Sequence, residues 1–176
     1  NQPEMTAETF DSEGFLKTGD IGTLEDGFLR ITDRKKDLIK TSGGKYVAPQ
    51  ALGAQLKMAC SQISQVLVHG NNRNFCSCLV ALDPVAIQSW ATQNGLTNLS
   101  YQDLTKNEKV KEMLQGVING VNKTLPSYET LKKFAILPLD LTLEDGDLTP
   151  SLKLKRKAVE AKYKDLLDSF YTGGKD

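Results

Sequence analysis

The hydrophobic and polar positions at the beginning of the chain predict a polar helical segment followed by a β-hairpin. The stretch from Glu4 to Asp11 is mostly polar and compatible with a helix. Asp20–Leu24 and Gly27–Ile31 are typical of strands, and the acidic and glycine residues from Glu25 to Gly27 are typical of a tight turn between them. A two-stranded hairpin is only marginally stable alone in water. We therefore expect these strands to pack against a sheet in a larger preceding domain.

From Leu38 onward the pattern predicts a separate α+β unit. Two short strands, Leu38–Lys40 and Tyr46–Ala48, flank a glycine turn, and Pro49 suits the first turn of a helix. Longer apolar runs and a 3.6-residue period indicate the remaining elements. The expected strands are Ile63–His69, Phe75–Leu82 and Phe134–Leu137, and the expected helices are Gln50–Ala59, Pro84–Asn94, Lys106–Leu125 and one closing helix after residue 149.

Two of these helices have a clear apolar face. In the helix from Lys106 to Leu125, Thr105 and Glu108 have the spacing of a capping box, and Pro126 ends the helix. The apolar face of the closing helix consists of Val159, Tyr163, Leu166, Leu167 and Phe170. The whole pattern predicts a small mixed or antiparallel sheet flanked by helices.

The charge balance narrows the function classes. Lysine and arginine number 22, as do aspartate and glutamate, so the formal net charge is zero. A general nucleic-acid binder carries a clear basic excess, and we expect no nucleic-acid partner. No apolar run approaches the roughly 20 residues that a membrane-spanning helix needs, and the first residues do not resemble a signal peptide. We expect a cytoplasmic location and leave peripheral membrane contact open.

The cysteines and the single histidine are not expected to be catalytic. Cys76 and Cys78 are two residues apart in a strand, so they share a face with Val80 and Leu82. Burial as small apolar side chains is favoured over a metal or redox pair, because too few other ligands lie nearby. His69 has no evident nucleophile as a partner and is interpreted as structural.

Three clusters carry candidate chemistry, and each also has a simpler interpretation. Thr18 to Asp20 could bind a ribose, since a carboxylate accepts two hydrogen bonds from neighbouring hydroxyls, or it could be a turn. The basic and glycine residues from Asp33 to Lys45 suit phosphate or carboxylate, or form a solvated connector. The third cluster runs from Leu148 to Arg156, where any single lysine is by default exposed.

Together, the order and spacing of these clusters resemble the late motifs of the adenylate-forming superfamily, which includes acyl-CoA synthetases, firefly luciferases and nonribosomal peptide adenylation domains. Thr18 to Asp20 looks like its ribose-binding signature, Asp33 to Lys40 its hinge, Ser42 to Pro49 the turn that follows, and Leu152 to Arg156 its terminal motif. The resemblance covers essentially the whole chain.

The long-chain fatty acyl-CoA synthetase branch resembles the chain most. Leu125 to Thr130, Lys133 to Leu137 and Leu148 to Lys153 point to that branch, and the Ser-Gly-Lys sequence usual in luciferases and peptide adenylation domains is absent. One departure is the pair Gly53 and Ala54, where the family usually carries an acidic residue in the helix after Pro49.

The resemblance implies two half-reactions: a fatty carboxylate and ATP form acyl-AMP and pyrophosphate, and coenzyme A then displaces AMP. It also implies a need for Mg²⁺, although no residue here is a convincing metal ligand. The roles implied are ribose binding for Asp20 and Arg34, catalysis of adenylation for Lys153, the hinge torsion for Lys36, and contacts on the coenzyme A side for Gly43, Gly44, Lys40 and Lys45.

The implied organisation is the tail of an adenylate-binding domain at residues 1–32, a hinge at 33–37 and a lid domain at 38–176, with the upstream domain as the lid's partner. No glycine-rich ATP loop and no acyl tunnel are present, so we expect a C-terminal fragment of a longer ligase. The alternatives are the lid of another acyl- or aryl-adenylating ligase and a noncatalytic module that keeps the fold. An ATP loop upstream would separate the enzymes from the module.

Overall fold

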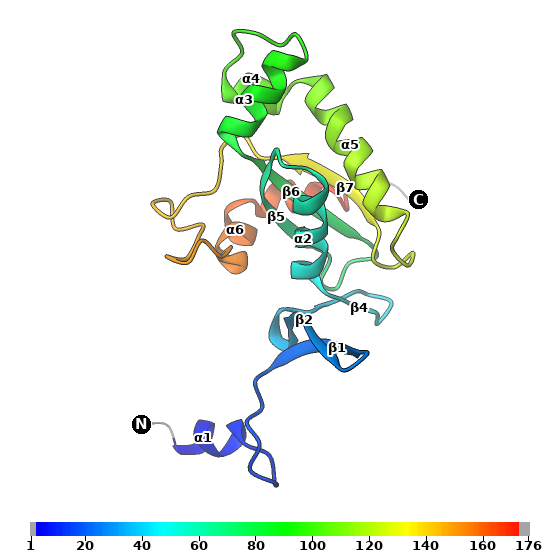
Figure 1. Cartoon of the computed structure of the whole chain (residues 1–176), viewed down its shortest axis with the longest axis vertical. Coiled ribbons are helices and arrows are strands. Elements are labelled where there is room, and N and C mark those ends of the chain that lie inside the picture. Colours follow the sequence, from blue (N-terminus) through cyan, green and yellow to red (C-terminus); the bar gives the residue numbers. More distant parts are fainter. Residues whose placement is uncertain (1–2, 173–176) are drawn as a thin grey trace.

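The computed structural model describes residues 3–172 and has a well-packed α+β region at one end and an extended β-hairpin region at the other (Figure 1). Along the long axis, the first helix lies farthest out, the hairpin follows, and the lid sheet with its helices forms the opposite end. The helices are α1 Pro3–Thr9, α2 Pro49–Ala59, α3 Pro84–Gln93, α4 Tyr101–Thr105, α5 Glu108–Asn122, α6 Arg156–Lys162 and α7 Lys164–Ser169. The strands are β1 Asp20–Glu25, β2 Phe28–Arg34, β3 Ile39–Lys40, β4 Tyr46–Val47, β5 Ile63–His69, β6 Cys76–Leu82 and β7 Leu131–Ile136, and one 3₁₀ turn, η1, spans Lys35–Asp37.

The predicted hairpin is confirmed. β1 and β2 pair antiparallel, with Glu25 opposite Phe28. The two turn residues, Asp26 and Gly27, both have positive φ, at 50° and 81°. Such a turn matches the twist of the flanking strands and is favoured by Asp-Gly, which explains why it was readable from the sequence.

The α+β unit that follows, which is the predicted lid, contains a mixed three-stranded sheet, and its strand order is β5-β6-β7. β5 and β6 are antiparallel, whereas β6 and β7 are parallel because α3, α4 and α5 form the crossover between them. Strands β3 and β4 form a second small pair beside this sheet. The architecture is therefore the α+β arrangement of small sheets and flanking helices that the pattern indicates.

Helices cover both faces of the lid sheet. On one face, Cys76, Cys78, Val80 and Leu82 pack with α2, α3, α4 and α5. On the other face, residues such as Leu79 pack with α6, α7 and the loop after β7. Alternating residues of β6 thus enter two separate cores, and the whole strand is buried.

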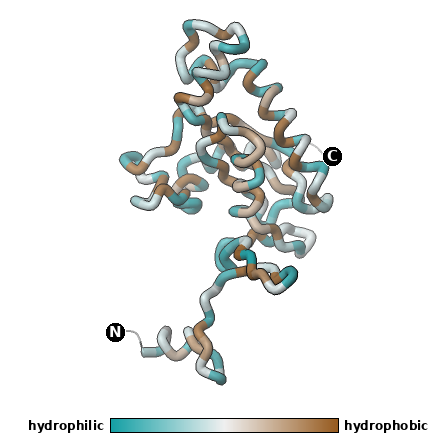
Figure 2. Tube along the Cα trace, viewed as in Figure 1, coloured by the Kyte–Doolittle hydropathy of each residue, from teal (hydrophilic) through white to brown (hydrophobic). Residues whose placement is uncertain are grey.

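The hairpin lacks such cover among the described residues. Figure 2 shows hydrophobic segments in the hairpin as well as in the lid. Four apolar side chains of the hairpin are largely exposed: Leu24, Phe28, Leu29 and Ile31, with Phe28 at 80% of its reference surface.

No helix within residues 3–172 has the length and apolar character needed to cross a membrane.

Several predicted boundaries were wrong. The capping box lies at Ser100 and Asp103, where it opens the unpredicted helix α4. Thr105 instead ends α4, and α5 begins at Glu108 with the Asn107 side chain accepting from the Lys109 amide. Both sequence positions fit the same cap pattern, so the pattern alone could not separate them.

The closing helix and the last strand also differ from the prediction. Tyr163 has φ −112° and ψ 25°, which divides the closing helix into α6 and α7. The apolar side chains still face the sheet on both sides of the break. β7 starts at Leu131 rather than Phe134, because Leu131 and Lys133 also pair with β6, opposite Cys76 and Ser77.

Candidate functional site

Asp20 and Arg34 face each other at the open end of the hairpin. Asp20 begins β1 and Arg34 ends β2, and the antiparallel register places them directly opposite each other. The Arg34 Nε donates to Asp20 Oδ1 at 2.8 Å, and the two side chains remain 53% and 25% exposed. The Asp20 carboxylate therefore pairs with Arg34. The turn before β1 is stabilised instead by the Thr18 hydroxyl, which accepts a hydrogen bond from the Asp20 amide at 3.2 Å.

A cavity of about 310 Å³ adjoins this ion pair and reaches the predicted hinge. Its lining residues are Thr18, Gly19, Arg34, Lys35 and Lys36. The Lys35 amide donates to the Gly19 carbonyl at 2.8 Å, which joins the loop before β1 to the turn after β2. Two predicted ribose residues and the predicted hinge residue are thus neighbours, although they come from separate motifs.

The predicted hinge, residues 33–37, consists of the end of β2 and the 3₁₀ turn η1. Lys36 is exposed in the middle of η1. Short 3₁₀ segments have poorer hydrogen-bond geometry than α-helices and frequently serve as connectors. A change of torsion at Lys36 therefore disrupts few contacts of Lys36 itself.

Lys153 projects from a hydrogen-bonded loop before α6. The Thr149 amide donates to the Lys153 carbonyl at 2.8 Å, and the Thr149 hydroxyl accepts from the Lys153 amide at 3.1 Å. Leu152 has a φ of 58°, a conformation that L side chains with a Cβ rarely adopt. The loop is anchored by Leu148, which is buried in the second core and bridges to Leu154. The Lys153 side chain is exposed and makes no hydrogen bond or ion pair within the described residues.

Arg156 connects the Lys153 motif to the lid sheet. It begins α6 and is 17% exposed. Its Nη2 donates to the Val68 carbonyl of β5 at 2.7 Å and lies 3.6 Å from Glu160. Burial lowers the pKa of Arg156, whereas the negative charges of Glu160, Asp33 and Asp37 raise it. Arg156 could be predicted from the sequence only as a member of the terminal motif, because its contact with β5 depends on the packing of α6.

The glycine loop between β3 and β4 has open space around it. Gly44 has a φ of 77°, and a Cβ at this position would meet no heavy atom within 4 Å. At Gly43 the nearest such atom is the Thr41 hydroxyl, at 3.9 Å. Neither glycine is therefore packed against other atoms of the described residues on its Cβ side. The ammonium groups of Lys40 and Lys45 lie over the rings of Tyr46 and Tyr128, at 5.7 and 5.9 Å from the ring centres.

The structure does not bring all predicted residues into one site. Within residues 3–172, no hydrogen bond or ion pair joins Lys153 to Asp20 or Arg34. The loop that precedes α6 lies apart from the β1–β2 hairpin in Figure 1. Asp20 and Arg34 precede the predicted hinge residue Lys36, and Lys153 follows it in the predicted lid domain.

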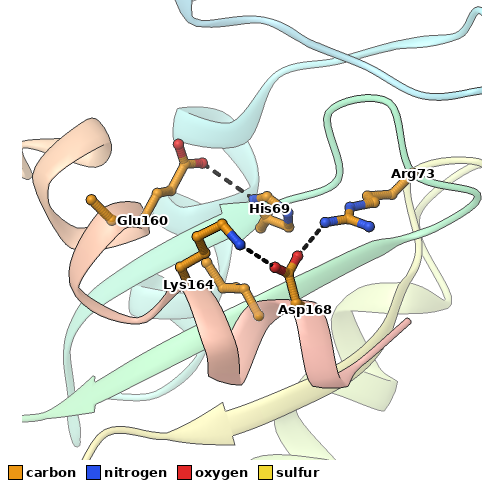
Figure 3. Close-up of a pocket in the computed structure, with 7 residues that line it drawn as sticks. His69, Arg73, Glu160, Lys164 and Asp168 are labelled. Carbon is orange, nitrogen blue, oxygen red and sulfur yellow. Dashed lines mark hydrogen bonds and ion pairs between the residues drawn. The ribbon is translucent and has the colours of Figure 1, made fainter. Parts of the chain in front are cut away.

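A second cavity, of about 270 Å³, lies where His69 meets α6 and α7 (Figure 3). His69 Nδ1 lies 3.4 Å from Glu160, and its buried Nε2 has no hydrogen-bond partner within the described residues. Asp168 pairs with both Arg73 and Lys164. The hydrogen bond from His69 and the charge of Arg156 lower the pKa of Glu160. Because these charges are already paired, we assign no ligand to this cavity.

The three cysteines are buried free thiols. Burial raises the pKa of Cys76 to about 11 and that of Cys78 to about 12, so both remain protonated near neutral pH. Their packing beside Val80 and Leu82 confirms the interpretation as buried core side chains.

Comparison with known proteins identifies the class of this unit. The family profile described as the AMP-binding enzyme C-terminal domain matches residues 36–175, and the chain belongs to that family. A long-chain-fatty-acid–CoA ligase of Mycobacterium tuberculosis is 39% identical over 96% of this chain, and mouse long-chain-fatty-acid–CoA ligase 5 is 36% identical over 96%. The chain spans only 28% and 25% of those two relatives.

A solved structure extends the likeness to the hairpin. The adenylation domain of a carboxylate reductase from Mycobacterium chelonae is 28% identical, with a TM-score of 0.76 over 98% of this chain and 25% of its own. The corresponding domain from Segniliparus rugosus, in complex with AMP and a carboxylic acid, is 28% identical, with a TM-score of 0.75 over 97% of this chain and 25% of its own.

Proposed function

We propose that this chain is the C-terminal part of an AMP-forming long-chain fatty acid–CoA ligase. The observation that carries the proposal is the Asp20–Arg34 ion pair beside a cavity that also reaches Lys36, in a chain 36–39% identical to such ligases. In this proposal, residues 1–32 complete the upstream domain, 33–37 are the hinge and 38–176 are the lid. The substrates are a fatty acid, ATP and coenzyme A, and the location is cytoplasmic.

The first half-reaction forms acyl-AMP. A carboxylate oxygen of the fatty acid attacks the α-phosphorus of ATP, and pyrophosphate leaves with the electrons of the broken P–O bond. Asp20 accepts hydrogen bonds from the ribose hydroxyls, and Arg34 holds Asp20 in place while it contacts the nucleotide. Lys153, an exposed cation without a protein partner among the described residues, offsets the charge that accumulates as two anions meet.

The second half-reaction forms the thioester. The sulfur of coenzyme A attacks the acyl carbonyl carbon, AMP leaves with the electrons of the broken C–O bond, and the thiol proton passes to solvent. Rotation about Lys36 removes Lys153 and brings the glycine loop toward the site. The open space at Gly43 and Gly44 admits a thin chain, and Lys40 and Lys45 lie where they can meet phosphate.

Mg²⁺ is expected for the whole enzyme, but the described residues offer no site for it. They contain no group of three or more His, Cys, Asp or Glu side chains placed to hold a metal ion. We therefore assign no metal ligand to this chain and derive no step through the metal.

Other adenylating ligases remain the second candidate, because the likeness to carboxylate reductase adenylation domains covers almost the whole chain. The test is ATP–pyrophosphate exchange by the full-length protein with a series of fatty acids and with aromatic acids, followed by thioester formation with coenzyme A. Exchange and thioester formation with long-chain acids support the proposal. Exchange with aromatic acids alone favours the second candidate, and no exchange with any acid contradicts both.

The isolated 176-residue chain should be inactive, since it contains neither an ATP loop nor an acyl tunnel. Incubation with MgATP, palmitate and coenzyme A should give no thioester. Turnover at about 1 per second or faster, which is typical of enzymes, would contradict the fragment interpretation.

A further inference from the structure

Asp33 is a buried carboxylate at the end of β2, only 3% exposed. Its Oδ1 accepts from the Arg34 amide at 2.7 Å, and its Oδ2 accepts from the Gln50 amide at 2.9 Å. The second bond joins the hairpin strand to the first turn of α2 in the lid. A charge run such as Asp33 to Asp37 is typical of a solvated connector, so the burial of Asp33 and its contact with α2 could not be predicted from the run.

The first turn of α2 depends on this external acceptor. The first amides of a helix have no partner within the helix. Ala48 occupies the cap position and has no side-chain acceptor, and Pro49 has no amide hydrogen. The Asp33 carboxylate therefore takes the place of a cap from 17 residues upstream. Its negative charge also complements the positive end of the helix dipole.

This bond spans the hinge. Asp33 precedes Lys36 and Gln50 follows it, so a large rotation about the torsions of Lys36 must separate the two. Asp37 also contacts Gln50, accepting from the side-chain amide at 3.1 Å. Asp37, however, lies on the lid side of Lys36 and moves together with α2. The chain thus supplies two acidic residues at one helix end, on opposite sides of the pivot.

The negative charges of the same two carboxylates raise the pKa of Arg156 in the terminal motif. Asp33 and Asp37 both lie within electrostatic range of Arg156, which bonds to the Val68 carbonyl and begins the helix directly after the Lys153 loop. In the lid orientation of this structure, Arg156 therefore interacts electrostatically with Asp33, the residue whose hydrogen bond to Gln50 spans the hinge.

We propose that Asp33 is a latch that holds the lid in the orientation seen in this structure and that must release α2 before the lid can rotate. Asp33 is a positioning residue, since it contacts the hinge and the lid. The proposal rests on the proposed two-step function for its catalytic consequence, but the latch itself is a statement about lid orientation. Loss of the Asp33–Gln50 hydrogen bond should favour the lid orientation that differs from the one in this structure. The half-reaction that requires that orientation should then become faster relative to the other.

The test uses the full-length protein with one fluorophore in the upstream domain and a second on Met58→Cys, because Met58 is 88% exposed on α2. Energy transfer reports the lid distribution, and the two half-reactions are assayed separately. Hydrogen bonds to charged groups contribute enough that Asp33→Ala should shift the distribution by about tenfold or more. The two half-reactions should then change in opposite directions. Asp33→Asn keeps an acceptor oxygen and the side-chain shape and should give a smaller shift of the same sign.

Asp37→Ala is the matched control and should leave both the distribution and the ratio of half-reaction rates near wild type. An unchanged lid distribution in folded Asp33→Ala and Asp33→Asn would overturn the latch, as would equal effects of Asp33→Ala and Asp37→Ala. Parallel losses in both half-reactions would assign Asp33 a merely structural role. A wild-type protein that forms no acyl-AMP would contradict the proposed function, while the energy-transfer measurement would still decide on the latch.

Discussion

The β1–β2 hairpin and the β5–β6 pair have the same antiparallel geometry but very different surroundings. β6 is buried along its whole length between two helical layers, whereas the apolar residues of the hairpin are largely exposed. Strand pairing alone therefore does not account for the apolar side chains of β1 and β2. The α+β unit around β6 has its own core. The hairpin instead exposes apolar side chains, which the proposed upstream domain would cover in the full-length protein.

The largest difference between the two regions should appear on truncation of a leucine. Leu79 is 1% exposed at the centre of β6, so Leu79→Ala should lower the free energy of unfolding by about 2–5 kcal/mol. Leu29, in the hairpin, is 69% exposed, and Leu29→Ala should change the free energy of unfolding by no more than about 0.5 kcal/mol in this chain. Urea unfolding of both variants measures the contrast. Equal losses would show that the hairpin is already part of the core.

A second experiment tests the predicted hinge between the hairpin and the lid. Lys36→Pro fixes φ at one residue of η1 and removes its amide hydrogen. In the full-length protein it should slow thioester formation from synthetic acyl-AMP more than it slows acyl-AMP formation, because only the change of lid orientation needs the torsion. Lys36→Ala, which removes the same side chain but leaves the backbone torsion and the amide hydrogen free, is the comparison variant. Equal slowing of both half-reactions by Lys36→Pro would mean that the segment is an ordinary linker.

The smallest expected effect concerns the lid and pH. The hydrogen bond from His69, with a contribution from Arg156, lowers the pKa of Glu160 from its ordinary value of 4.5. Ionised Glu160 therefore stabilises the folded lid above pH 4.5, and this contribution disappears as pH falls through the lowered value. Because the side chain is 33% exposed, we expect no more than about 1 kcal/mol.

Glu160→Gln tests this prediction in urea unfolding at several pH values. The variant should be less stable than wild type at pH 7 and should match it once the wild-type carboxyl is protonated. A difference between the two that is independent of pH would contradict the electrostatic origin of the effect.

The elements with strong local signals could be predicted from the sequence, and those that depend on distant contacts could not. Asp26 and Gly27 tolerate positive φ, and Pro49 suits a first helical turn, so the hairpin and the start of α2 were readable. The break at Tyr163 was hidden because the apolar spacing continues across it. Two neighbouring cap patterns, Ser100 with Asp103 and Thr105 with Glu108, led to the wrong start for α5.

In the candidate site, too, the contacts set by local pairing could be predicted from the sequence, and the contacts between distant elements could not. Register explains why Asp20 and Arg34 meet, since they begin one strand and end its partner. The role of Asp33 depends on an amide 17 residues away, and the proximity of Arg156 to the hinge depends on the packing of α6 against β5. No local pattern encodes such contacts, and the charge run around Asp33 is typical of a solvated segment.

In the proposed mechanism, the lid carries a cation, Lys153, that acts in the first half-reaction and is away from the site in the second. The most direct measurement is the rate of each half-reaction in full-length Lys153→Ala, with Lys155→Ala as the matched neighbour. Acyl-AMP formation should fall by about 10²–10³, the usual effect of losing one charge-stabilising group. Thioester formation from synthetic acyl-AMP should stay near wild type, and Lys155→Ala should affect neither step. Survival of both half-reactions in Lys153→Ala, or equal loss of both, would contradict the account.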